Sequence, residues 1–161
     1  MSLFPYHISI YQNYALIFLA GSYCVAALSD LRRMAAQSDF AEVWVAAVAV
    51  LLSLDAYFLF AGELLPISFI VKWILILAFS SLALTIRLLS IAPMDVAAAA
   101  ATAAALPPVS AGAYFIFLAV VGELLSPILK HFGSDDAYPY LPAVFVSSTI
   151  VVCMSLAGIL P

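Results

Sequence analysis

The sequence predicts an all-α membrane protein, a polytopic bundle of six transmembrane helices. Of its 161 residues, 67% are hydrophobic and 9% are charged, a composition too apolar for a water-soluble domain. Apolar runs long enough to span a bilayer, about 20 residues, also follow one another with only short loops between them. We expect a single domain over 1–161, because no loop is long enough to hold a separate soluble fold.

Six apolar segments are expected, near residues 9–30, 40–61, 66–88, 94–107, 112–131 and 139–160. Prolines mark most of the boundaries, because proline is tolerated in the first turn of a helix and breaks its interior. Pro66 opens the third segment and Pro93 opens the fourth, which Pro107 and Pro108 close. A Gly-Ser-Asp-Asp turn over 133–136 separates the last two segments.

The basic residues predict the orientation of the bundle. Arg32 and Arg33 lie in the first expected loop, Arg87 in the third and Lys130 in the fifth, whereas Lys72 lies toward the opposite end. Cytoplasmic loops of membrane proteins hold the excess of Lys and Arg. We therefore expect a multi-pass protein of the cell membrane with its first, third and fifth loops in the cytoplasm and both termini outside.

The fourth segment is unusually short. From Pro93 to Leu106 it has 14 residues, which cover about 21 Å of a hydrocarbon core of about 30 Å. Either the helix continues through a kink at the proline pair, or it starts below the membrane surface and leaves Asp95 in a recess. Eight alanines over 97–105, interrupted only by Thr102, offer a smooth surface for close helix contact.

Two acids, Asp30 and Asp95, mark helix ends on the expected cytoplasmic side. Two carboxylates a few Å apart do not both ionise, so one keeps a proton while the other acts as a base toward water. Such a pair would suit peptide hydrolysis by an aspartyl dyad. The simpler interpretation is that Asp30 pairs with Arg33 and that Asp95 stabilises the first turn behind Pro93.

The remaining acids have ordinary interpretations. Five are expected on solvated loops or helix ends: Asp39, Glu42, Glu63, Asp135 and Asp136. Asp55 lies within reach of Lys72 if the second and third helices pack together, which favours an ion pair over a role in transport. Glu123 lies about 10 Å inside the fifth helix from Lys130. It either tunes an active site or hydrogen-bonds to a neighbouring helix.

Two stretches resemble the motifs of one known family. Ser29-Asp30-Leu31-Arg32-Arg33 is similar to the motif that ends the first helix of the prepilin and preflagellin peptidases, six-helix membrane aspartyl proteases of the GxGD type. Asp95, followed by a small-residue helix that ends at Pro107, resembles their second motif. Ala92 and Met94 stand where the family has its two glycines. The zinc-binding cysteine pairs of many bacterial members are missing, so the compact archaeal form is the nearer comparison.

The resemblance implies an aspartic-type endopeptidase with Asp30 and Asp95 as its catalytic residues. Its partners would be the lipid bilayer and the precursors of type IV pilin-like or archaellin-like proteins, whose leader peptides it would cut at the cytoplasmic border. Acids near this border are candidate substrate-binding residues for a basic leader: Asp39, Glu42, Glu123, Asp135 and Asp136. Equally, acidic residues are common on solvated loops.

Two other functions stay open. The altered glycine motif would suit a catalytically silent relative or an accessory membrane subunit. A small proton-coupled transporter would instead use Asp55, Glu123 and Asp95 as relay sites along the bundle.

Cofactors, metals and nucleic acid are not expected. His7 and His131 are far from each other in the sequence, and Cys24 and Cys153 lie far apart inside apolar segments, where we expect them to be buried. With five Lys and Arg residues in all, the chain lacks the basic surface that binds nucleic acid.

Overall fold

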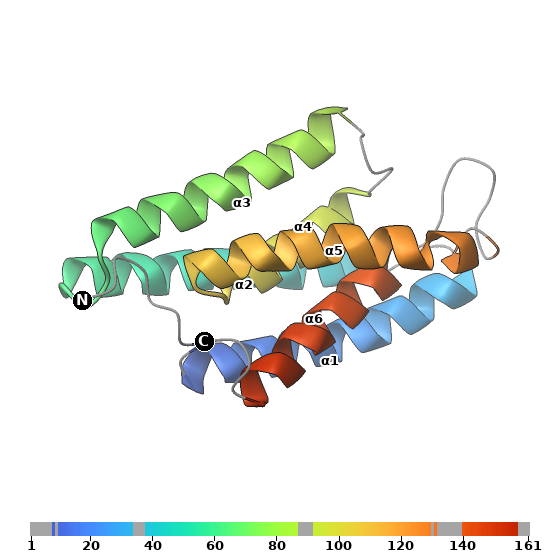
Figure 1. Cartoon of the computed structure of the whole chain (residues 1–161), viewed down its shortest axis with the longest axis horizontal. Helices are drawn as coiled ribbons and strands as arrows, with labels where there is room; N and C mark the ends of the chain where they lie inside the picture. Colours follow the sequence, from blue (N-terminus) through green and yellow to red (C-terminus); the bar gives the residue numbers. More distant parts are fainter. Residues whose placement is uncertain are drawn as a thin grey trace.

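The computed structural model describes residues 8, 10–33, 38–86, 92–129, 131 and 140–157. This part of the chain is all-α, as predicted, and holds six helices. They are α1 (Ile10–Arg33), α2 (Ser38–Phe60), α3 (Pro66–Ile86), α4 (Pro93–Ala104), α5 (Pro108–Leu129) and α6 (Leu141–Leu156). Successive helices run in alternating directions, so that the end of α1 and the start of α4 lie at the same end of the molecule (Figure 1).

Three of the described helices are long and apolar enough to cross a membrane. They are α2 over Asp39–Phe60, α3 over Pro66–Thr85 and α5 over Pro108–Leu129. The 16 residues of α6 are apolar but cover only about 24 Å. Gln12 and Asn13 make the first turns of α1 polar. Judged by length and apolar composition, the described part of the chain thus supports a membrane protein with three spanning helices, whereas six were expected.

The short helix α4 lies at the centre of the bundle. It packs against each of the other five helices. Ala98, Ala101 and Ala103 are completely buried, and because a methyl group takes little room, their helix can be approached closely from several sides. The alanine run therefore makes the helix contacts that the sequence predicts.

The chain reverses direction after α4. Ala104 ends the helix, Ala105 and Leu106 form a turn, and α5 starts at Pro108. In Figure 1, α5 runs back alongside α4. The kinked continuation that the sequence left open is therefore wrong, and α4 has 12 residues, about 18 Å of helix. Pro107 and Pro108 produce the turn because neither can donate the backbone hydrogen bond that would prolong α4.

Neighbours in sequence are not always the main neighbours in space. The first helix, α1, packs chiefly against α6 and only lightly against α2. Its main link to α2 is Trp44, whose indole N–H donates to Ser22 Oγ (3.0 Å) and whose ring meets Tyr23 edge to face. On the other side of the bundle, stacked rings of Phe79 and Phe115, 4.1 Å apart, join α3 to α5.

Candidate functional site

Asp95 lies in the first turn of α4 and is buried, with 4% of its surface exposed. Ala92 has an extended backbone and Pro93 follows it as the first helical residue. The backbone N–H of Ala92 donates to Asp95 Oδ2 at 3.1 Å. The carboxylate thus closes the start of its own helix, where the helix dipole also favours negative charge.

A chain of buried hydroxyl groups begins one turn further along α4. Tyr23 of α1 donates its hydroxyl to the carbonyl of Ala98 (2.8 Å), and Thr102 donates to the Tyr23 hydroxyl (3.1 Å). Ser148 of α6 lies 3.1 Å from the Thr102 hydroxyl and completes the chain. The buried Tyr114 hydroxyl of α5 finds no hydrogen-bond partner among the described residues. These contacts fix how far α1 and α6 are shifted along α4.

The structure describes only part of the residue set expected around Asp95. Asp30 belongs to α1, but the structure describes only its backbone. Asp135 and Asp136 lie outside the described residues. Asp39 and Glu42 are exposed in the first turns of α2, at the same end of the bundle as Asp95 (Figure 1). Glu123 is exposed on α5. The meeting of Asp30 with Asp95 stays a prediction.

The expected ion pair between Asp55 and Lys72 is confirmed. Lys72 Nζ lies 2.7 Å from Asp55 Oδ2, and the two side chains are 5% and 18% exposed, with lysine the more buried. The indole N–H of Trp73 donates to the same carboxylate oxygen at 3.0 Å. A cavity of about 50 Å³ adjoins the pair and is also lined by Pro107 and Pro108, so the pair sits beside the end of α4 that is opposite Asp95.

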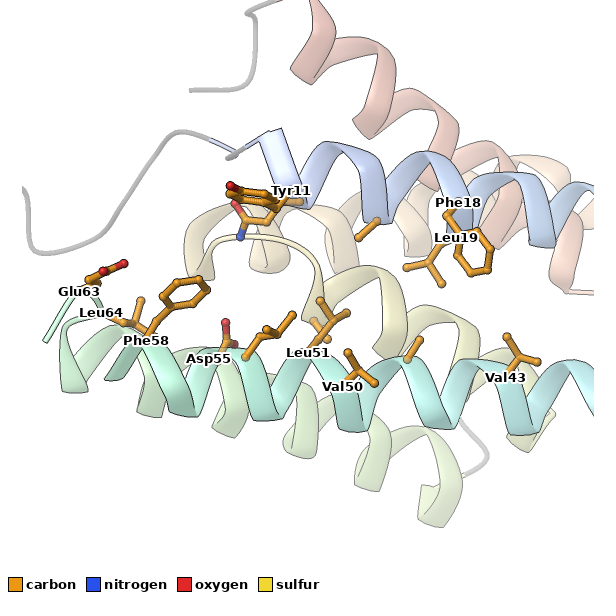
Figure 2. A pocket seen from close by; sticks show the side chains of 15 residues that line it. Tyr11, Phe18, Leu19, Val43, Val50, Leu51, Asp55, Phe58, Glu63 and Leu64 are labelled. Atoms are coloured by element: carbon orange, nitrogen blue, oxygen red, sulfur yellow. The ribbon is translucent and has the colours of Figure 1, made fainter. Parts of the chain in front are cut away.

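A groove between α1 and α2 was not predicted. Its volume is about 730 Å³, and Ala104 of α4 also lines it. Figure 2 shows Phe18 and Leu19 of α1 facing Leu51 and other side chains of α2 across it. The lining of α2 recurs at helical spacing, at Val43, Ala47, Val50, Leu51, Leu54 and Phe58. Because α2 is apolar on nearly every face, this stripe gives no distinct signal in the sequence.

Within the described residues, no group of three or more His, Cys, Asp and Glu side chains could hold a metal ion. Both cysteines are free. Cys24 is half-buried, whereas Cys153 is exposed, so the expectation that both are buried is wrong for Cys153. Residues near the end of a short outer helix such as α6 have fewer neighbours to cover them.

The sequence matches no protein-family model, and neither the curated proteins nor the solved structures contain a match to it.

Proposed function

We propose that this protein is an aspartyl endopeptidase of the membrane border, which cuts leader peptides from type IV pilin-like or archaellin-like precursors. The supporting observation is the buried Asp95 carboxylate at the start of the central helix, at the end of the bundle where α1, which carries Asp30, also ends. A buried carboxylate among apolar helices is costly, and such groups are usually kept for function.

The contact between Tyr23 and Ala98 gives the register of the two helices. Asp30 follows Tyr23 by seven residues, about 10 Å, and Asp95 precedes Ala98 by three, about 4.5 Å. Because α1 and α4 run in opposite directions, both displacements point to the same end of the bundle. The backbone positions of the two acids then differ by about 6 Å along the helix axes.

The positions on α1 favour the same pairing. Tyr23, Ala26 and Ala27 are buried. Counted from Tyr23, these residues and Asp30 stand at positions i, i+3, i+4 and i+7 of the helix. Residues so spaced share one face of a helix. The position of Asp30 along α1 thus falls on the same helical face as Tyr23, Ala26 and Ala27.

In the proposed reaction, the two carboxyl groups share one proton and titrate as a unit. The ionised carboxylate takes a proton from a water molecule, whose oxygen bonds to the scissile carbonyl carbon. The protonated carboxyl group donates its proton to the carbonyl oxygen. When the C–N bond of the tetrahedral intermediate breaks, the proton held by the first carboxylate goes to the leaving amine. The second carboxylate takes a proton back from one hydroxyl group of the intermediate, which becomes the product carboxylic acid, and the pair again holds one proton.

The exposed acids Asp39 and Glu42 lie at the same end as Asp95, and we propose that they attract the basic leader within about 10 Å, the Debye length at 0.1 M salt. The proposal also places this end in the cytoplasm, both chain termini outside and all six helices in the membrane. Exposed acids of this kind raise the rate at which a basic leader reaches the site, and they add little to its binding affinity.

One specific observation favours a second candidate, a catalytically silent relative. The Asp95 carboxylate already accepts the Ala92 N–H, so capping alone accounts for it. A proton relay has less support, because Asp55 is held in an ion pair with Lys72 and Glu123 is exposed on α5.

The test is processing of a type IV pilin precursor, with a short basic leader before its hydrophobic helix, by membranes that contain this protein. Wild type should cut the precursor, and Asp30→Asn and Asp95→Asn should not. Asp95→Asn is the decisive variant, because its amide oxygen can still accept the Ala92 N–H. Thr85→Val, at an exposed hydroxyl group of α3, is the control and should cut normally.

The proposal fails if wild type leaves the precursor intact, or if either asparagine variant cuts at the full rate. No cutting by wild type, together with normal folding of Asp95→Asn and loss of folded protein in Asp95→Ala, would identify Asp95 as a capping residue and favour the silent relative.

A further inference from the structure

The groove between α1 and α2 opens to the outside of the bundle and is apolar over most of its length. Val50 of α2 is 58% exposed and Phe18 of α1 is 64% exposed, although both line it. Figure 2 shows the side chains of the two helices facing one another across the gap. Along α2 the lining extends from Val43 to Phe58, 15 residues or about 22 Å. That is most of the length of a membrane-spanning helix.

One end of this groove lies level with Asp95. Asp55 and Pro107 line the same small cavity, so they lie at one height in the bundle. Asp95 precedes Ala104, the last residue of α4, by nine residues or about 13.5 Å, and Val43 precedes Asp55 by 12 residues or about 18 Å. Since α2 and α4 run in the same direction (Figure 1), the heights of Val43 and Asp95 differ by only about 5 Å.

Both ends of the groove carry an exposed acid, Glu42 at the Val43 end and Glu63, which lines the groove, at the other end, so the height of Asp95 and not charge alone selects the orientation of an occupant. At the Val43 end, Glu42 is exposed one residue before the lining begins, in the first turns of α2. A segment with a basic stretch followed by an apolar helix would place its basic part beside this carboxylate and its helix along the groove. The junction between the two parts would then lie at the height of Asp95.

We infer that the groove is the lateral docking site for the hydrophobic helix of the precursor, which enters between α1 and α2 from the lipid. This inference rests on the proposed function, because it names the part of the same substrate that the protein holds. The helix packs against the small side chains of Ala15, Ala47 and Ala104, which allow close approach as small residues do between membrane helices. The scissile bond is thereby held at the border where the basic leader ends.

Photo-crosslinking tests the contact directly, and α2 offers matched controls. The photoreactive residue p-benzoylphenylalanine replaces Val50 or Leu54, which line the groove, or Val45 or Leu52, which do not. Val50 and Val45 are both 58% exposed, and Leu54 and Leu52 are 46% and 40% exposed. The full chain carries Asp95→Asn, so that a pilin precursor stays uncut in the same membranes. The lining positions should give several-fold more adduct with the precursor helix.

Processing provides a second readout that does not depend on adduct formation. Val50→Trp fills the groove and should slow cutting several-fold, whereas Val45→Trp, on another face of α2, should leave it unchanged. Equal adducts at lining and control positions, or adducts with lipid alone, would overturn the docking site.

Failure of the inference and failure of the proposed function give different results. If wild type cuts the precursor but the groove positions give no adduct, only the docking site is wrong. If wild type does not cut the precursor and the groove positions still give the adduct, the groove stands as a helix-binding site and the peptidase is wrong. Absence of both cutting and adduct overturns both.

Discussion

Replacing Asp55 with asparagine should destabilise the protein by about 3–5 kcal/mol, the usual cost of removing one partner from a buried ion pair. The variant leaves the Lys72 ammonium, 5% exposed and 2.7 Å from its former carboxylate, without a counter-charge. The amide that replaces the carboxylate would retain an acceptor for the indole N–H of Trp73, which now donates at 3.0 Å. Loss of charge, and not loss of that hydrogen bond, therefore accounts for the effect.

The reciprocal change should cost less. Lys72→Met leaves a carboxylate that is 18% exposed and still accepts from Trp73, so we expect a cost near the lower end of the same range, about 3 kcal/mol. The double variant, Asp55→Asn with Lys72→Met, has no buried charge at this place. It should be more stable than Asp55→Asn alone, because replacing both members of a buried pair is often neutral.

Reversible unfolding in mixed detergent micelles would measure these differences as a double-mutant cycle. Glu63→Gln is the matched control, since Glu63 is an exposed acid near the end of α2, and it should change the free energy of unfolding by less than about 0.5 kcal/mol. If the free energy of unfolding of Asp55→Asn differs from that of wild type by less than about 0.5 kcal/mol, Lys72 does not need its counter-charge and the prediction is wrong. It is also wrong if the loss of the double variant equals the sum of the two single losses.

Two further stability predictions use the same assay. Thr102→Val should cost about 1–3 kcal/mol, because it removes the middle of a buried hydroxyl chain, whereas Thr85→Val, at an exposed hydroxyl, should be close to neutral. Gly122→Ala should cost about 1–3 kcal/mol, since its methyl group would lie 2.6 Å from the Tyr140 hydroxyl. Gly112→Ala meets no atom within 4 Å and should be neutral or stabilising. Equal results for either pair would contradict the packing described above.

Much of the fold could be predicted because its signals are local. Pro66 and Pro93 stand at the first residue of α3 and α4, where a missing backbone N–H costs nothing, whereas Pro108, expected to close the fourth segment, instead starts α5. The Asp55–Lys72 pair was predictable for a related reason. Charges inside an apolar bundle need a partner, and these two lie at similar depths on consecutive helices.

The arrangement of the helices around α4 could not be predicted in this way. In a water-soluble protein the buried face of a helix is apolar and the exposed face is polar. In α2, by contrast, the exposed Val45 and Val50 and the buried Trp44 are all apolar. Periodicity therefore does not reveal that α1 turns toward α6 and leaves a groove beside α2. The hydroxyl chain through Thr102 likewise depends on helices that are distant in sequence.

The last turn of α4 is buried, its first residue Pro93 is exposed, and each end of the helix has a charged group beside it. Asp95 caps the first turn, and Lys72 lines a cavity with Pro107 just beyond the last turn. These signs match the helix dipole, so a purely structural role would explain both charges. The two roles can be separated by comparing stability with cutting. Substitution of Lys72 should lower stability and leave the cutting rate per folded molecule unchanged, whereas Asp95→Asn should abolish cutting and leave stability nearly unchanged. A catalytic carboxylate requires that second pattern, and a capping residue cannot produce it.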